Sequence, residues 1–405
     1  MDSIEELLTR GVDKIYPSKE ELEKELRRGK KLTLYQGFDP TGIQMHIGHM
    51  VGLMKLRQWQ DLGHEVIFLI GDGTGQAGDP SGKTRAREKF LTNAELRKNA
   101  TDYVLQAASI VRFDGDNPVK ILYNGDWLNK LTLADILDIA GHFTLQQLVE
   151  RDLFQERMKH NEPINLREFL YPLLQGYDSV AMKVDLELGG SDQTFNMLCG
   201  RSLVKDYLDK EKFVMTTPLL TDATGRKIGK TEGNAIGITD TPEELFGKIM
   251  SLDDSVIAKG LECLTTIPMH EVKQIQDALE HGEHPMGFKK RLAYDIIETL
   301  HNDQVAIEAQ KHFEKTVQNK EMPSEIQTIT LPSLMISTAT IGTVLVYSGT
   351  ATSISDAKRV AEQGGLTING ERISNVNLPF APYLKDGHVT IKRGKLNIKN
   401  IVGEK

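Results

Sequence analysis

The chain has 405 residues, of which 39% are hydrophobic and 26% charged, and its formal net charge is -8. This length exceeds what one hydrophobic core usually organises, so we expect two or three domains. The composition is that of a folded protein and excludes a largely disordered chain. The acidic balance excludes a protein that coats nucleic acid indiscriminately.

The cysteines and the distribution of charge further narrow the class of protein. Cys199 and Cys263 have no His or Cys neighbours at metal spacing, which excludes a zinc site or a disulfide framework. No apolar run approaches ~18 residues, and Met1–Glu6 is acidic where a leader would be basic. We therefore expect a cytoplasmic protein without a membrane segment. From Ile341 onward nine Lys or Arg stand against five Asp or Glu, which predicts a basic C-terminal module on an acidic body.

Strands alternate with helices over the first 240 residues, which predicts an α/β fold with a parallel sheet between helices. The carboxyl ends of such strands border the ligand crevice of open α/β sheets, so the chemistry is expected there. A helix from Met50 to Leu62, with Gly63 as its stop, follows the first strand. The candidate strands are Leu32–Gln36, Val66–Gly71, Val119–Tyr123, Asp185–Leu188 and Phe213–Leu220.

The second half of the chain contains a helical region, a connector and a small module of mixed structure. Thr241–Glu244 is a capping box with Pro at the first helical position, and it opens a helical region that reaches about Asn302. Residues from Val317 to Thr338 have weak periodicity and are interpreted as a connector. The remainder predicts a small α+β module with three local signals: a helix capped from Ser353 to Asp356, an Asn369-Gly370 hairpin, and two strands within Val389–Ile398.

The Gly-rich segment after the second strand satisfies two familiar phosphate-binding patterns incompletely. Gly73, Gly75 and Gly78 fit the dinucleotide fingerprint, but Asp79-Pro80 follows where a helix should continue. Ala77–Thr84 resembles a Walker A loop, except that Ala replaces its first Gly and Pro80 removes a backbone amide. A nicotinamide-dependent dehydrogenase is therefore a minority alternative, and a plain Gly-rich turn stays open.

The segment His46-Ile47-Gly48-His49 lies between the first strand and its helix. Gly48 lets backbone approach a ligand closely, and the two His lie at the positive end of the helix, which suits triphosphate oxygens. Capping residues, or half of a metal site, explain the pair about equally well.

A cationic loop from Asp222 to Thr231 follows the last strand. Lys227 and Lys230 are three residues apart, interleaved with Gly and followed by the hydroxyl of Thr231, so they can close over a phosphate chain. Alone, such a loop is more often a solvated turn. Together with His46–His49 it favours a phosphate clamp.

These two segments resemble the HIGH and KMSKS signatures of class I aminoacyl-tRNA synthetases, with Ile228, Gly229 and Thr231 as departures from the second. Over essentially the whole chain the resemblance narrows to the bacterial type of the tyrosyl-tRNA synthetase family, although Gln36 stands where many relatives have Cys. The segments that carry it are Leu34–Thr41, Gly78–Lys83, Tyr171–Asp178 and Gly189–Gln193.

The resemblance implies a reaction and a domain plan. The reaction would be that of a tyrosine-tRNA ligase, which activates L-tyrosine with ATP to tyrosyl-adenylate, releases pyrophosphate, and transfers tyrosyl to the 3' end of tRNA(Tyr). Mg is expected with ATP and without a dedicated protein cage. The plan is a homodimer with a Rossmann-like catalytic domain at 1–240 that carries a helical dimerisation region at about 127–165, an α-helical anticodon-binding domain at 241–318, a linker at 319–340, and a small RNA-binding domain of ribosomal-protein type at 341–405.

Selection of tyrosine can be argued from spacing. Tyr171, Gln175 and Asp178 share one helix face, which is either a pocket wall or the solvated stripe of a surface helix. A buried Asp178 and the hydroxyl of Tyr35 would be left unpaired by phenylalanine and satisfied by the phenol of tyrosine. Tryptophan specificity is the nearest alternative within the class. A non-catalytic RNA-binding protein on the same scaffold is the alternative outside it.

The resemblance also implies the individual site residues. For tyrosine they are Tyr35, Asp79, Tyr171, Gln175, Asp178 and Gln193. For ATP they are Gly37, Asp39, His46, Gly48, His49, Gly190, Asp192, Ile228 and Lys230. For phosphate chemistry they are Thr41, His46, His49, Lys83, Lys227, Lys230 and Thr231. Candidates for RNA phosphates, or simply solvated charges, are Lys358, Arg359, Lys392 and Arg393.

Overall fold

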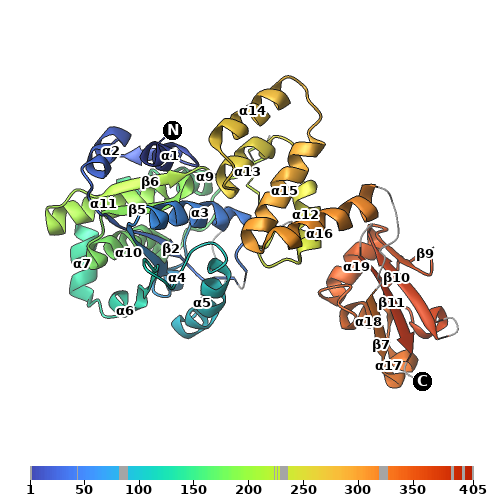
Figure 1. Cartoon of the computed structure of the whole chain (residues 1–405). Helices are drawn as coiled ribbons and strands as arrows, with labels where there is room; N and C mark the ends of the chain where they lie inside the picture. Colours follow the sequence, from blue (N-terminus) through green and yellow to red (C-terminus); the bar gives the residue numbers. More distant parts are fainter. Residues whose placement is uncertain are drawn as a thin grey trace. The chain divides into compact units, whose positions relative to one another are not determined.

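The structure, a computed structural model, divides into two compact units, Met1–Ile307 and Glu308–Lys405 (Figure 1). It describes residues 2–42, 44–81, 90–222, 224–225, 227–228, 236–318, 327–384, 387–394 and 397–403. In this part of the chain, no helix combines the length and apolar character that crossing a bilayer requires.

The first unit is built on a six-stranded sheet of order β1-β6-β5-β2-β3-β4, parallel except for β1 at one edge. The expected strands are confirmed to within three residues at each end, and β1 is an addition. Three residues at a sheet edge carry too little alternation to stand out in a sequence. The strands are β1 Lys14–Tyr16, β2 Thr33–Phe38, β3 Glu65–Ile70, β4 Lys120–Tyr123, β5 Leu186–Gly190 and β6 Phe213–Thr217.

Helices cover the sheet (Figure 1). The apolar run of β3 is buried from Val66 to Ile70, as expected for a parallel strand that is covered on both faces. The helix after β2 begins at Ile47 and ends at Asp61, and Gly63 beyond it has the predicted positive φ of 81°. The helices are α1 Ser3–Thr9, α2 Lys19–Arg27, α3 Ile47–Asp61, α4 Thr74–Ala77, α5 Asn93–Ala107, α6 Gly125–Leu128, α7 Leu133–Gly141, α8 Leu145–Val149, α9 Asp152–Lys159, α10 Leu166–Met182 and α11 Thr194–Leu208.

The Gly-rich segment forms no dinucleotide-binding turn. Among the described residues of this segment, one helical turn, α4, lies between Gly73 and Gly78; it ends at Ala77, and Gly78 has a φ of 81°. A dinucleotide fingerprint needs a longer helix whose first amides face the pyrophosphate. This geometry removes the main support for the dehydrogenase alternative.

The predicted helical region is present after the sheet, and the hydroxyl oxygen of Thr241 accepts the amide of Glu244 to cap its first helix. All but the end of this region falls within the first compact unit, so a domain boundary at residue 240 stays a prediction. The helices are α12 Pro242–Met250, α13 Val256–Leu264, α14 Met269–Glu280, α15 Met286–Leu300 and α16 Asp303–Phe313, and a π-helical turn, η2 Glu314–Gln318, follows.

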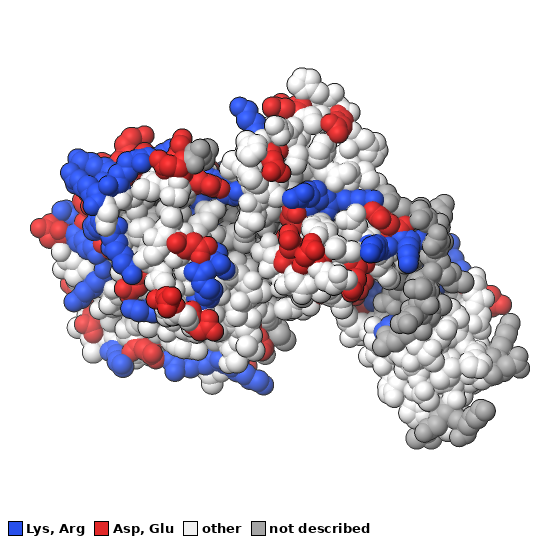
Figure 2. Space-filling view, in the orientation of Figure 1, with Lys and Arg blue, Asp and Glu red and all other residues white. Residues whose placement is uncertain are grey.

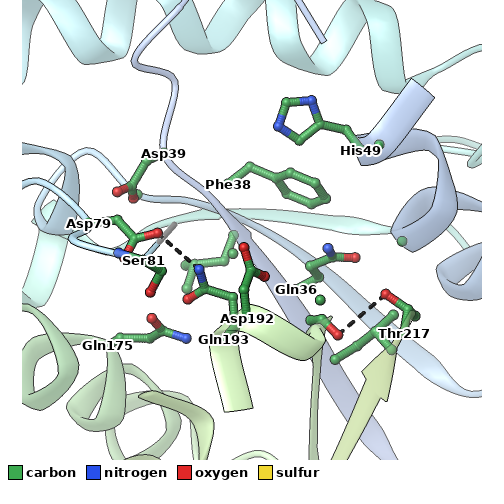
Figure 3. A pocket seen from close by; sticks show the side chains of 18 of the residues that line it. Gln36, Phe38, Asp39, His49, Asp79, Ser81, Gln175, Asp192, Gln193 and Thr217 are labelled. Atoms are coloured by element: carbon green, nitrogen blue, oxygen red, sulfur yellow. Dashed lines mark hydrogen bonds between the residues drawn. The ribbon is translucent and has the colours of Figure 1, made fainter. Parts of the chain in front are cut away.

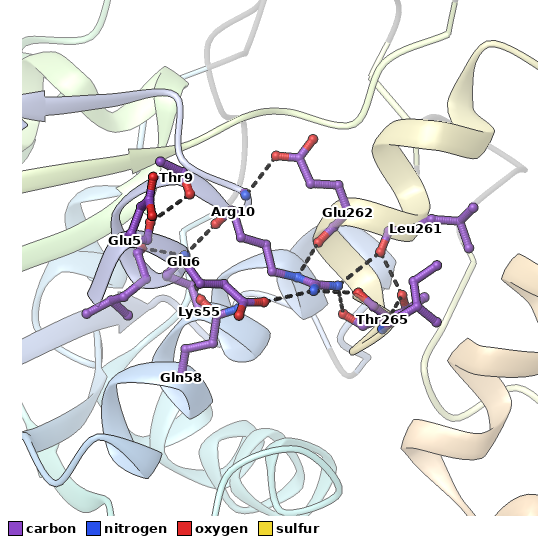
Figure 4. Close-up of polar contacts among 12 residues, drawn as sticks. Glu5, Glu6, Thr9, Arg10, Lys55, Gln58, Leu261, Glu262 and Thr265 are labelled. Carbon is purple, nitrogen blue, oxygen red and sulfur yellow. Dashed lines mark hydrogen bonds and ion pairs between the residues drawn. The ribbon is translucent and has the colours of Figure 1, made fainter. Parts of the chain in front are cut away.

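A buried polar joint ties α1 and α3 to α13 (Figure 4). The Arg10 guanidinium donates to the carbonyl oxygens of Leu261, Glu262, Thr265 and Ile267, where the C-terminal turn of α13 leaves acceptors without intrahelical partners. Lys55 of α3 donates in turn to the carbonyl oxygens of residues 7 and 10. One side chain therefore caps a helix that lies more than 250 residues away in the sequence.

The second unit is an α+β module with a sheet of order β7-β11-β10-β8-β9. The predicted hairpin is confirmed, with Asn369 and Gly370 at φ values of 51° and 84°, and Ser353 caps α19 as predicted. The elements are β7 Gln327–Leu331, α17 Ser333–Thr338, α18 Ile341–Tyr347, α19 Ile354–Glu362, β8 Leu366–Ile368, β9 Glu371–Arg372, η3 Ala381–Tyr383, β10 His388–Arg393 and β11 Asn397–Gly403.

Part of the expected connector belongs to this module. Residues 327–338 form β7 and α17, and β7 pairs in parallel with β11. The five-residue alternation before Pro332 was too short to identify as a strand without its distant partner.

Candidate active site

A cavity of about 800 Å³ opens at the carboxyl ends of β2, β3, β5 and β6, the edge predicted to carry the chemistry (Figure 3). Lys83, Lys230 and Thr231 lie outside the described residues. The other predicted site residues all line the cavity: Tyr35, Gly37, Asp39, Thr41, His46, Gly48, His49, Asp79, Tyr171, Gln175, Asp178, Gly190, Asp192, Gln193, Lys227 and Ile228.

The two His of the first signature form a capping box at the start of α3. The His46 Nδ1 atom accepts the amide of Gly48 at 3.1 Å, and the His49 Nδ1 atom accepts the amide of His46 at 3.1 Å. Since both Nδ1 atoms accept hydrogen bonds, the ring hydrogen of each neutral imidazole lies on Nε2. The capping interpretation is therefore correct.

The described residues of the second signature, Lys227 and Ile228, lie close to the first. The amide of Ile47 donates to the carbonyl oxygen of Ile236 at 3.0 Å, and a Cβ on Gly48 would stand 3.8 Å from the carbonyl oxygen of Ile228. Lys227 Nζ donates to Asp192 Oδ2 at 2.7 Å across the cavity mouth. Residues about 180 positions apart in the sequence therefore meet beside one helix N-terminus.

Acidic and amide side chains gather where α10 faces the end of β2. Tyr171 donates to Asp39 Oδ2 at 2.9 Å, and the amide nitrogen of Gln193 donates to Asp79 Oδ2 at 2.9 Å. Burial is the main reason why the pKa of Tyr171 is raised well above its usual value, so its hydroxyl stays protonated. Asp39, which was predicted on the nucleotide side, thus directly contacts a residue of the predicted tyrosine set.

Asp178 lies at the deep end of the cavity and is 1% exposed. Its Oδ1 accepts the indole N–H of Trp127 at 2.8 Å, and its Oδ2 accepts the amide nitrogen of Asn124 at 2.9 Å. Burial raises its pKa well above the usual value, while these two hydrogen bonds act in the opposite direction. The expectation that phenylalanine would leave this carboxylate unpaired is therefore wrong, although each oxygen retains a second acceptor site.

Tyr35 is buried beside Asp178, and its hydroxyl lies 2.9 Å from Ser179 Oγ. Burial, followed by the charge of Glu187, raises the pKa of Tyr35 well above its usual value. Glu187 also accepts the Gln175 amide nitrogen at 2.9 Å. The second residue of the predicted phenol pair is thus also engaged before any substrate arrives.

The sequence did not single out several residues that support the cavity. Thr74 donates to Asp39 at 2.7 Å, and Asn124 donates to Thr74 at 2.9 Å as well as to Asp178. Asn124 follows directly after β4, so the rule that polar residues at strand ends build sites would have found it. Ser179, Glu187 and Lys212 sit in a helix or at strands, with no local motif to mark them.

The position of Gln36, a departure from the family pattern, is accommodated by a glycine. Its Oε1 is buried and, among the residues described, has no hydrogen-bond partner. A Cβ on Gly52 of α3 would stand 2.3 Å from this oxygen, so the amide occupies space that only glycine leaves open.

Comparisons with known proteins agree with this arrangement. The family profile described as tRNA synthetases class I (W and Y) matches residues 27–318. The tyrosine-tRNA ligase of Carboxydothermus hydrogenoformans is 42% identical over 99% of this chain and 98% of its own length. That of Thermotoga maritima is 40% identical over 95% of this chain and 94% of its own length. A C-terminally truncated mitochondrial tyrosyl-tRNA synthetase of Coccidioides posadasii superposes with a TM-score of 0.62 at 26% identity, covering 77% of this chain and 91% of that one.

Proposed function

Since the chain belongs to the class I tRNA synthetase family, in the branch of the tyrosine-tRNA ligases, we propose that the cavity at the carboxyl edge of its sheet is where tyrosine is activated. The chain is an enzyme that ligates tyrosine to tRNA with ATP. The observation that carries the proposal is the meeting of the two signature segments at a cavity whose deep end holds Asp178 and Tyr35.

Tyrosine binds through its two polar ends, the phenol and the ammonium. Its phenol lies between Tyr35 and Asp178, where a phenol can donate to a carboxylate and accept from a hydroxyl. Its ammonium lies by resemblance among acceptors at the other end, at Asp79, Tyr171, Gln175 and Gln193. A site built to hydrogen-bond a hydroxyl discriminates strongly against the analogue that lacks it.

ATP enters as its magnesium complex, with its phosphates over the start of α3. The resemblance places it against Gly37, Asp39, Gly48, Gly190, Asp192 and Ile228. His46 and His49, whose rings are held by the capping hydrogen bonds, are assigned to the phosphates together with Thr41. Asp39 has a second role in this proposal, since it also orients Tyr171.

A tyrosine carboxylate oxygen attacks the α-phosphorus in line, a P–O bond to tyrosine forms, and the bond to the bridging oxygen of pyrophosphate breaks. This step needs positioning and charge neutralisation more than a protein nucleophile. Lys227 is assigned to the leaving pyrophosphate, which has to compete with Asp192 for that ammonium. Lys83, Lys230 and Thr231 are assigned to the same charge by sequence alone.

The remaining partners are proposals of the same kind. Exposed leucines on α7 and α8 support a homodimer through the region at about 127–165, because monomers rarely expose such residues together. They are Leu133, Leu137 and Leu145, with exposures of 73%, 64% and 63%. We propose that the enzyme acts in the cytoplasm.

The tRNA is assigned to the helices after residue 241 and to the second unit. On the face drawn in Figure 2, basic and acidic side chains are interspersed over the described surface of the first unit, so this face offers RNA no continuous basic band. Arg359 and Arg393 in the second unit both pair with Asp356, and Lys358 lies 4.0 Å from a Glu362 carboxylate oxygen, which makes Lys392 the better phosphate candidate of the four.

The test is ATP-pyrophosphate exchange with each of the twenty amino acids in turn. Exchange that depends on tyrosine alone supports the proposal. Exchange that depends on tryptophan, or no exchange with any amino acid, overturns it.

A further inference from the structure

A buried ion pair lies at the wall of the cavity, which its Glu187 member lines. Lys212 precedes β6 and is 0% exposed, and Glu187 in β5 is 1% exposed. The three donors of the Lys212 ammonium have three acceptors: Glu187 Oε2, Ser179 Oγ at 2.7 Å and the carbonyl oxygen of Met197 at 3.3 Å. A Cβ on Gly200 would stand 2.6 Å from Lys212 Nζ, so the backbone of α11 leaves room for this ammonium.

We propose that the Lys212–Glu187 pair, acting through Ser179, is a positioning device that sets the hydrogen-bond direction of two groups that touch tyrosine, Tyr35 and Gln175. This inference rests on the proposed function of the cavity, and it assigns to these three residues a role in amino-acid selection. Lys212 and Ser179 are not among the residues that line the cavity, so they act through their neighbours.

The first arm runs from Lys212 to the phenol. An ammonium only donates, so Ser179 Oγ must accept from Lys212. The hydroxyl hydrogen of Ser179 then turns to the Tyr35 oxygen at 2.9 Å, which is closer than Glu187 Oε2 at 3.3 Å. Tyr35, as an acceptor, keeps its own hydrogen for the phenol oxygen of the substrate. The phenol in turn gives its hydrogen to Asp178.

The second arm runs from Glu187 to the ammonium of the substrate. A carboxylate only accepts, so Gln175 must turn its amide nitrogen toward Glu187 Oε1 at 2.9 Å. The carbonyl oxygen of Gln175 is then directed away from Glu187. Among the described residues this buried oxygen has no partner, which makes it a ready acceptor for an ammonium.

Energetics support a positioning role over a merely stabilising one. Burying an ion pair costs desolvation that its attraction often only offsets, and apolar replacement of a whole pair is frequently neutral or stabilising. Removing one partner leaves an uncompensated buried charge. The informative variant is therefore the double substitution Lys212→Met with Glu187→Gln, which keeps the volume and removes both charges.

The experiment measures tyrosine-dependent and phenylalanine-dependent ATP-pyrophosphate exchange in the full chain. We expect the double variant to raise the KM for tyrosine and to lower the tyrosine-to-phenylalanine ratio of kcat/KM about tenfold or more, a loss of the order of one oriented hydrogen bond. The KM for ATP should not change. The single substitution Ser179→Ala breaks only the first arm and should lower the same ratio.

The matched control is a second buried pair among the described residues, Arg157 with Glu168, whose closest atoms are 2.6 Å apart and which lies outside the cavity lining. Arg157→Met with Glu168→Gln should keep the ratio. An unchanged ratio in both test variants, or an equal fall in the control, overturns the inference. If the double variant does not fold, Ser179→Ala decides. A wild-type chain without tyrosine-dependent exchange refutes the proposed function instead.

Discussion

Replacing Trp127 by Phe removes one hydrogen-bond donor from Asp178 and leaves most of the ring in place. The indole N–H lies 2.8 Å from Asp178 Oδ1, and the Asn124 amide on the other oxygen is unaffected. A hydrogen bond to a charged group contributes about 1.5–3 kcal/mol. The Trp127 hydrogen bond lowers the pKa of Asp178, so its loss raises that pKa further.

The direction of the change in KM follows from the hydrogen bond that the substrate phenol donates to Asp178. Burial already raises the pKa of Asp178, and the Trp127 hydrogen bond opposes that rise. Below its pKa the carboxyl is protonated and accepts the phenol hydrogen poorly. The KM for tyrosine therefore increases as the pH falls, and in Trp127→Phe this increase begins at a higher pH, while the KM for ATP stays the same.

The assay is tyrosine-dependent ATP-pyrophosphate exchange across a pH series. Trp59→Phe is the matched control, because Trp59 is fully buried outside the cavity and its indole nitrogen has no partner among the described residues. The control should follow the wild-type profile. A Trp127→Phe profile with the wild-type midpoint and the wild-type KM for tyrosine would refute the reasoning about Asp178.

Three further predictions concern separate parts of the chain. Lys230→Ala should slow adenylate formation strongly with little change in tyrosine affinity, because its charge serves the leaving pyrophosphate; unchanged pyrophosphate release in a single turnover contradicts this. Leu137→Glu, which places a charge on a leucine that is 64% exposed, should convert a dimer to monomers in sedimentation, and an unchanged mass speaks against this interface. Although burial acts against it, the Thr352 amide and the Arg359 and Arg393 pairs lower the pKa of Asp356 to about 2. The stability it adds is therefore full above its ordinary pKa of 3.8 and lost as the pH falls toward 2. Asp356→Asn should lower the calorimetric midpoint of the second unit at pH 6 but not at pH 2, and an equal deficit at both pH values counts against it.

Much of the fold and of the site could be predicted from local sequence patterns. The strands of the sheet, the capped start of α12 and the Asn369-Gly370 hairpin each depend on neighbours within a few residues, so their signals are complete in a short window. The signature segments are equally local. Their meeting at one helix start could be predicted from the rule that strand ends share a sheet edge.

Side-chain partnerships between distant segments could not be predicted this way. Lys212 lies 33 residues from Ser179, and Asn124 lies 54 residues from Asp178. Lys212 is an ordinary polar residue in its own window, and only the packing of β5, β6 and α10 brings it to Ser179. The position of Asn124 at the end of β4 marks it as a site residue, but nothing local indicates that Asp178 is its partner. The prediction for Asp178 was wrong for the same reason, because it treated the carboxylate without the donors that surround it.

The joint at Arg10 has a consequence for the order in which the enzyme becomes complete during synthesis. Arg10 finds its acceptor on Thr265 only after 255 further residues have been made, and Lys14 of β1 waits 202 residues for Thr216. The N-terminal segment that contains Arg10 and Lys14 is therefore synthesised early but reaches its native contacts late. Until α13 emerges from the ribosome, Arg10 lacks its carbonyl partners on α13. The backbone carbonyls of residues 7 and 10, which accept from Lys55, are therefore not yet held in place. Helix α3, which contains both Lys55 and His49, gains these contacts late.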